Sequence, residues 1–351
     1  MGNLYIVLKP LFENLGISVV TPSKPNKECL KLGARLSPEW VCLPFKVNLG
    51  NLIDALDKGA DTLLSVSGAW ACRFGYYGRV QHKILHDLGY RFESIILGNS
   101  KIGVFERIRE INGGKTISNI IKGVRIALKK AEVLEKIENL SRKIRPYEED
   151  KGEVTQVFNR CLRDLEKTNT IPEIKMVEKR SSELFKRVKK DLSRKPLRVR
   201  LVGETYLMLE PFVNFEIERR LGEMGVEVEP VLNIRKWVLH PFRLGMGGRD
   251  GEKRARRVAK KYLPYPLGGE DQLTIGYTIL SSKTYDGIVH VYPFTCMPEN
   301  ISRTVLNRVI KDYKIPVISL SIDEHSSPSG MITRLEAFID LLNTRRNHRL
   351  H

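Results

Sequence analysis

The sequence predicts an α/β fold of two lobes with mostly parallel sheets, joined by a helical segment. Amphipathic helices end at a glycine and are followed by short apolar strands, and this order recurs along the chain. A charged, strand-poor stretch interrupts the order once, and the 351 residues suit two domains of ordinary size. Because parallel strands need helical crossovers, we expect doubly wound sheets of the flavodoxin or Rossmann type.

The first lobe is expected over residues 1–115. Its clearest unit is "NLIDALDKGADTLLSVSG", in which Leu52, Ile53 and Leu56 share a helical face, Gly59 stops the helix and residues 62–66 form a strand. The segment "VQHKILHDLGYRFESIIL" repeats this logic, with Gly89 at the helix end and a strand at 94–97. "ISVVTP" predicts a further strand over residues 17–21, and "WVCLPF" is another apolar run, ended by Pro44. The two histidines of "QHKILHDLG", His82 and His86, are expected on a solvated helix face.

A helical connection is expected over residues 116–195, and the second lobe over 196–351. The connection is charged and poor in strand signals, whereas strands resume at residues 199–202 and 226–229. A helix is predicted over 212–224. Two later strands lie in "YDGIVHVYPFTC" and "IPVISLSI", and "GMITRLEAFIDLLNTRRNHRL" predicts a closing helix with basic last turns, which favour the helix dipole.

Composition narrows the class of protein. Apolar residues make up 42% and charged residues 28%, as in soluble globular chains. We see neither a secretory signal nor an apolar run near the roughly 20 residues that cross a bilayer. The five cysteines are scattered and odd in number, which argues against a disulfide framework and for a reducing cytoplasm.

The chain is strongly basic, with 59 Lys and Arg against 41 Asp and Glu and a net charge of +18. Such a balance suits polyanions, including nucleic acid, phosphorylated cofactors and acidic partners. Much of the excess lies in "RKIRPY", "KRVKKDLSRKPLRVR" and "GRDGEKRARRVAKK", and solvated helix faces and loops explain these runs equally well. Aromatic residues do not interleave with them, so nucleic acid is an unlikely partner.

Three cysteines fall at or just past candidate strand ends: Cys42, Cys72 and Cys296. Ligands in open α/β sheets bind beyond the carboxyl ends of strands, and thiolates are preferred ligands of zinc and iron–sulfur clusters. The spacings of 30 residues (72 minus 42) and 224 residues (296 minus 72) form no local motif, and three packed thiols remain the alternative. Cys161 is expected to be packed, and Cys29 to lie in a loop.

Acidic and histidine side chains follow two further strands. Glu204 in "VGETYLMLEPFVN" is a candidate catalytic group that faces the same cleft or else caps the next helix. Asp323, Glu324 and His325 in "SLSIDEHSSPSG" are candidates for acid–base work or metal support, with His325 as the catalytic candidate. A hydrogen-bonded loop that caps the last helix is the alternative.

Five long segments resemble the 2-hydroxyacyl-CoA dehydratase family, in the branch related to its D-component and labelled CoA-protein activase. They are "LSPEWVCLPFKVNLGNLIDAL", "GADTLLSVSGAWACRFGYYGRVQHKILHDLGY", "VGETYLMLEPFVNFEIERRLGEMGVEV", "GIVHVYPFTCMPENI" and "IPVISLSIDEHSSPSGMITRLEAFIDLL". The resemblance implies a 4Fe-4S cluster, or a double-cubane cluster as in one branch, held by Cys42, Cys72 and Cys296. It also implies electrons from a separate ATP-hydrolysing iron–sulfur activator.

The resemblance leaves the activity open between a dehydratase-like lyase, an ATP-dependent reductase component and an accessory electron- or cluster-transfer protein. It implies a CoA thioester or another small substrate, and a homodimer or a related second subunit. A basic nucleic-acid binder is supported by charge alone. Two departures stand out. The sequence starts directly in the family's first helix, at "LYIVLKPLFENLG", so either the family's first strand is missing or the start is truncated. Glu270 in "LGGEDQ" stands where the family has a histidine, so the role of that histidine does not carry over.

Overall fold

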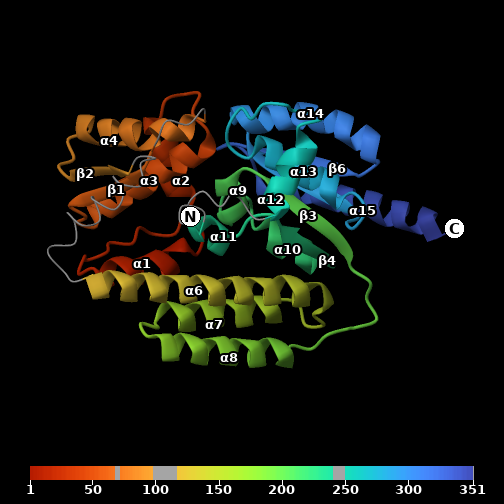
Figure 1. Cartoon of the computed structure of the whole chain (residues 1–351), viewed down its shortest axis with the longest axis horizontal. Coiled ribbons are helices and arrows are strands. Elements are labelled where there is room, and N and C mark those ends of the chain that lie inside the picture. Colours follow the sequence, from red (N-terminus) through yellow and green to blue (C-terminus); the bar gives the residue numbers. More distant parts are fainter. Residues whose placement is uncertain (68–71, 98–116, 240–249, 351) are drawn as a thin grey trace.

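Two α/β lobes lie side by side above a layer of long helices (Figure 1). The computed structural model describes residues 1–67, 72–97, 117–239 and 250–350. Both sheets are parallel, with two strands in the first lobe and four in the second. The predicted fold class is therefore confirmed. No helix within these ranges is long and apolar enough to cross a membrane.

The first lobe is built around two paired strands, β1 (Thr62–Val66) and β2 (Glu93–Leu97), in parallel register. Four further elements are α2 (Lys27–Leu36), α3 (Leu43–Asp57), η1 (Arg73–Tyr76) and α4 (Tyr77–Asp87). Gly59 and Gly89 follow α3 and α4 with φ of +90° and +91°, in the left-handed region where glycine is favoured. The predicted helix–glycine–strand units are confirmed.

Three predictions in this lobe are wrong. Residues 17–21 form no strand, because in the described chain no neighbouring strand pairs with them, and strand propensity depends on such context. Cys29 lies in α2 and not in a loop. His82 is buried and not solvated, because its ring lies between Ser65 Oγ of β1, at 2.9 Å from Nε2, and Ser94 of β2. His86 is exposed, as expected.

The helical layer consists of α6 (Ile117–Ile144), η2 (Arg145–Tyr147), α7 (Glu153–Glu166) and α8 (Ile171–Arg187). It has its own apolar core, which also takes in α1 (Leu4–Asn14) and α11 (Ile234–Leu239). Cys161 is buried in this core, as predicted. The chain's first helix thus packs on the helical layer, although the first lobe follows it in sequence.

The second lobe is a four-stranded parallel sheet in the order β4-β3-β5-β6. Its strands are β3 (Leu197–Gly203), β4 (Val226–Pro230), β5 (Gly287–Pro293) and β6 (Val317–Ile322). The helices are α9 (Thr205–Leu209), α10 (Ile217–Glu223), α12 (Asp250–Ala259), α13 (Asp271–Ser281), α14 (Met297–Tyr313) and α15 (Pro328–Leu350). This order is the start of a flavodoxin-like sheet, whose direction of growth switches between its first and third strands, here β3 and β5.

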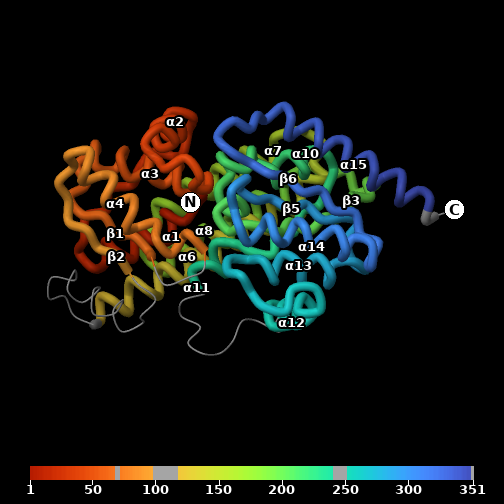
Figure 2. The backbone as a smooth tube through the Cα atoms, turned by 90° about the horizontal axis from the view of Figure 1, so that it is seen from above, coloured from red at the N-terminus to blue at the C-terminus, as the bar shows by residue number. Residues whose placement is uncertain are grey.

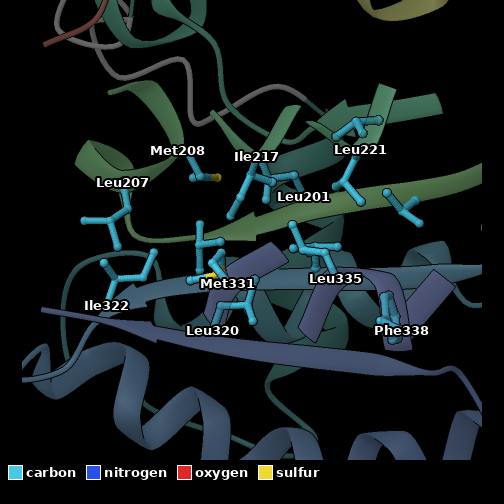
Figure 3. Close-up of a cluster of buried hydrophobic side chains, with 14 of the residues drawn as sticks. Leu201, Leu207, Met208, Ile217, Leu221, Leu320, Ile322, Met331, Leu335 and Phe338 are labelled. Atoms are coloured by element: carbon cyan, nitrogen blue, oxygen red, sulfur yellow. The ribbon is translucent and has the colours of Figure 1, made fainter. Parts of the chain in front are cut away.

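The core of the second lobe lies between the sheet and the helices that cover it. Figure 3 shows Leu207, Met208 and Ile217 on one side and Met331, Leu335 and Phe338 of α15 on the other, around strand residues such as Leu201 and Leu320. The helix predicted over 212–224 begins only at Ile217, because Phe215 and Glu216 have φ of 56° and 57°. Helical φ is negative, so the chain turns there before the helix starts.

Helix α3 ties the two lobes together. Its Phe45 and Leu49 belong to the first lobe's core, whereas Leu43 and Val47 belong to the core of the second lobe. Lys46, on the same helix and buried, forms an ion pair with Glu324 in the loop after β6. The first turns of α3 are therefore fixed against both lobes, whose neighbouring positions are also visible from above (Figure 2).

Candidate iron–sulfur site

The carboxyl ends of the strands supply most of the candidate site. Cys72 comes after β1, Glu204 directly after β3, and Cys296 after β5. Because β3 and β5 flank the point where the strand order reverses, Glu204 and Cys296 stand at the switch point of the sheet, where open α/β folds bind ligands. The backbone joins the two strands there, since the Glu204 N–H donates to the Val291 carbonyl at 3.0 Å.

A glycine makes that close approach possible. Gly203 has a φ of +132°, and a Cβ at this position would lie 1.9 Å from the Val291 carbonyl oxygen. Only glycine fits such a position without moving one strand. The location of Glu204 is therefore set by the residue before it.

All three cysteines begin a helix. Cys42 precedes α3, Cys72 precedes η1 and Cys296 precedes α14, and none of their thiols makes a capping hydrogen bond. Cys-Leu-Pro and Cys-Met-Pro open α3 and α14, with proline in the second helical position, where its missing N–H costs nothing. The sequence had suggested that Cys42 lies at a strand end, and this prediction is wrong. Pro44 lies in the first turn of a helix and does not end a strand.

One carboxylate, Glu204, raises the pKa of all three thiols. The pKa of Cys42 is raised to about 11, mainly by burial and also by Glu204 and Cys72, while the hydrogen bond with Tyr77 lowers it. Burial also raises the pKa of Cys296, with additional contributions from Glu204, Glu299 and Cys42. The pKa of Cys72 is raised by burial and by Glu204, against the backbone N–H of Phe74. Glu204 is therefore the group that Cys42, Cys72 and Cys296 have in common.

Carboxylates surround the thiols. The pKa of Glu204 is raised to about 7, mainly by burial and also by Glu299 and Glu270, against the N–H groups of Tyr206 and Leu207. The Leu207 N–H donates to Glu204 Oε2 at 3.0 Å. The pKa of Glu270 also rises to about 7, through burial and the charge of Glu299. Glu204 thus caps α9, and not the later helix, while it also lies among the cysteines.

Glu299 belongs to a buried polar chain. The Glu299 side chain is 1% exposed and that of His290 on β5 is 0% exposed, and His290 Nε2 lies 2.9 Å from Glu299 Oε2. Thr274 Oγ1 donates to Glu299 Oε1 at 3.2 Å, and His290 Nδ1 lies 3.1 Å from Ser319 Oγ on β6. These contacts fix the first turn of α14, and therefore the backbone at Cys296.

Tyr77 is the aromatic partner of the site. Its hydroxyl lies 2.5 Å from the Cys42 thiol, and its ring packs edge-on against Phe45 at 5.1 Å between centroids. Burial and the nearby Cys42 raise the pKa of Tyr77 well above its usual value. Tyr77 is therefore a neutral hydroxyl in hydrogen-bond contact with Cys42.

Thiolates are ligands of single metal ions and of iron–sulfur clusters alike. Among the described residues, no three His, Cys, Asp or Glu side chains come close enough together to hold a metal ion. A single ion requires its ligand atoms about 2.0–2.3 Å from one centre. In an iron–sulfur cluster each thiolate ligates a cluster of several irons, so its ligands stand further apart. Buried thiols among carboxylates also need positive charge to ionise, which iron supplies.

The loop after β6 does not join this site. Asp323 accepts from the His325 N–H at 3.0 Å and from the Ser326 hydroxyl at 2.8 Å, so it organises its own turn. The His325 side chain is exposed, and Glu324 pairs with Lys46. Cys29 donates to Asn51 Oδ1 at 3.1 Å, and burial raises its pKa to about 11. Of these contacts, the Lys46–Glu324 pair joins the two lobes, whereas the contacts of Asp323 and Cys29 stay within their own lobe.

Large apolar side chains are exposed next to the cysteines. Trp40 is 67% exposed, Tyr76 61% and Phe294 57%, and Met297 is exposed as well. Each lies within four residues of Cys42, Cys72 or Cys296, and Arg73 donates to the Trp40 carbonyl. We call Trp40, Tyr76, Phe294 and Met297 the apolar rim. Exposed apolar side chains mark interaction sites where they form a contiguous patch.

Sequence reasoning missed Tyr77, Glu270, Glu299 and His290 as members of the site. One signal was available for Glu299, because a glutamate in the third helical position after a capping residue is a helix-start pattern. The other three come from an inner strand or from helix starts with no local motif. No protein-family model matches the sequence, and no curated protein matches it either.

Proposed function

We propose that the protein is an iron–sulfur redox protein of the 2-hydroxyacyl-CoA dehydratase type, with Cys42, Cys72 and Cys296 as cluster ligands. The single observation that carries the proposal is the placement of the three cysteines, each of which directly precedes a helix without a capping hydrogen bond from its thiol, around a common carboxylate, Glu204. The five sequence motifs that resemble the family select the same three residues.

The cluster, when bound, would supply low-potential one-electron chemistry, and the chain's own residues would prepare its surroundings. The backbone N–H groups of Phe74 and Glu299 favour the thiolates of Cys72 and Cys296. Backbone N–H groups near cluster sulfurs also tune the reduction potential. The Tyr77 hydroxyl can donate a hydrogen bond to the Cys42 sulfur when that sulfur is a thiolate. We therefore propose that these donors set the potential of the site.

Glu204 and Glu270 are the proposed acid–base groups. With pKa values of about 7, each carboxyl can hold or release a proton near neutral pH, which suits general acid–base catalysis. Thr205 Oγ1 donates to Glu270 Oε1 at 3.1 Å and so orients that carboxyl. The His325 side chain is exposed in the loop after β6 and lies outside this group of residues, so Glu270 replaces it as the second candidate for acid–base catalysis. The substrate would be a CoA thioester or another small molecule.

A non-catalytic electron-transfer role is the second candidate, and the apolar rim favours it. Exposed aromatic residues around a redox site suit docking of another protein, such as an ATP-hydrolysing iron–sulfur activator. A cluster that reduces and reoxidises without turnover of any 2-hydroxyacyl-CoA would support this role over catalysis.

Anaerobic purification with iron and acid-labile sulfide counting tests the proposal. We expect the wild-type protein to hold a cluster and the single variants C42S, C72S and C296S each to lose most of it. C161S is the matched control, because its thiol is buried in the helical layer away from the site. An iron-free protein that iron and sulfide cannot reconstitute would overturn the proposal, as would equal iron in C161S and the three variants.

A further inference from the structure

A basic cavity of about 450 Å³ lies in the helical layer, where α6, α8 and α11 meet. Four basic residues, one acidic residue and three apolar residues line it: Arg125, Lys129, Lys175, Arg235, Glu132, Leu128, Ile171 and Leu239. Its volume falls within the range of small-molecule sites. None of these residues belongs to the cysteine site.

Two of the four cations are neutralised by the protein. Lys129 Nζ lies 2.9 Å from Glu132 and 3.0 Å from Glu178, and Arg235 lies 2.8 Å from Glu135. Arg125 and Lys175 have no carboxylate partner among the residues that the structure describes. These two exposed cations approach the cavity from different helices, α6 and α8.

The charge pattern of α6 points to an anion in the same place. Lys122, Arg125 and Lys129 follow one another at spacings of three and four residues, so they share one face of the helix. Like charges at these spacings destabilise a helix, and Glu132 and Glu178 relieve only the last of them. A bound anion would relieve the repulsion at Arg125.

We propose that this cavity binds a polyphosphate group, with Arg125 of α6 and Lys175 of α8 contacting neighbouring phosphates. The planar guanidinium of arginine can donate two parallel hydrogen bonds to one phosphate, and the lysine ammonium binds another as a point charge. Leu128, Ile171 and Leu239 offer an apolar wall for the remainder of an organic ligand. This site is independent of the proposed iron–sulfur function.

Calorimetric titration of the full-length protein with inorganic pyrophosphate, orthophosphate and ADP tests the proposal. We expect pyrophosphate to bind at least about tenfold more tightly than orthophosphate, because two cations meet two phosphates. The R125Q/K175Q variant should lose at least about tenfold in affinity for pyrophosphate. ADP that binds more tightly than pyrophosphate would identify the source as a nucleotide, and the reverse order would identify inorganic polyphosphate.

The matched control is K151Q/K283Q, which removes the same two charges from exposed lysines outside the cavity. It should bind pyrophosphate like the wild type. Three results would overturn the proposal: no binding of pyrophosphate or ADP at millimolar concentration, equal affinity in R125Q/K175Q and the wild type, or binding of a single-stranded oligonucleotide alone. Since all substituted side chains are exposed, thermal unfolding should be unchanged in both variants.

Discussion

The buried contact between Glu299 and His290 gives the sharpest test of how the site is built. Replacing Glu299 by alanine removes the acceptor for His290, at 2.9 Å, and for Thr274, at 3.2 Å. Hydrogen bonds to a charged group contribute about 1.5–3 kcal/mol each, so E299A should cost at least about 3 kcal/mol. The alanine also leaves the His290 ring nitrogen without this partner, in a position that is 0% exposed.

The conservative variant should separate charge from shape. In E299Q the amide keeps one acceptor oxygen, so about half of the loss, roughly 1.5 kcal/mol, is expected. Denaturant unfolding of the metal-free protein measures both values, through a midpoint that falls while the slope stays constant. For a lobe of about 150 residues, 3 kcal/mol corresponds to a Tm decrease of about 6–12 °C.

Glu336 provides the control, because its side chain is exposed on α15. E336A should stay within about 0.5 kcal/mol of the wild type. If E299A also stayed within that range, the dyad would not stabilise α14, and the positioning of Cys296 by Glu299 would be refuted. If instead E299A destabilises as expected, it should also take up less iron, since its helix begins at Cys296.

Three further predictions concern the strand end, the lobe contact and pH. In denaturant unfolding, G203A should lower the free energy of unfolding by about 2 kcal/mol or more, because its Cβ would lie 1.9 Å from Val291 O, and it should also reduce iron uptake. The control G225A, with open space around its Cβ, should lower the free energy of unfolding by only about 1 kcal/mol. K46A should lower the free energy of unfolding by about 1–3 kcal/mol, since it leaves Glu324 unpaired. An unchanged unfolding midpoint would contradict a role of this pair in joining the lobes. The raised pKa values of Glu204 and Glu270 mean that the metal-free folded state binds more protons than the unfolded state between pH 4.5 and about 7, so stability should fall as pH rises through that window. E204Q/E270Q should flatten the fall in a pH series of unfolding midpoints, and an equally steep fall in that variant would contradict the assignment.

Local sequence patterns were sufficient to predict the secondary structure wherever a helix ended at a glycine before an apolar strand. Residues 62–66 form β1 as predicted, because the preceding glycine and the β-branched residues of this segment both favour a strand there. The burial in the structure alternates along this strand. The same reasoning failed at residues 17–21 and at Cys42. An apolar run without a pairing strand stays irregular, and Pro44 serves a helix start as readily as a strand end.

The sequence by itself determined the α/β class, the parallel strands of the second lobe and the three cysteines as candidates, because these depend on periodicity and on strand ends. Only the tertiary structure decided which groups accompany the cysteines. Glu270, Tyr77 and the His290–Glu299 pair come from separate elements, and their roles depend on burial and charge that arise when the strand ends and helix starts meet. The tertiary structure likewise placed His325 in solvent and gave α3 a face in each core, since packing between lobes leaves no period in the sequence.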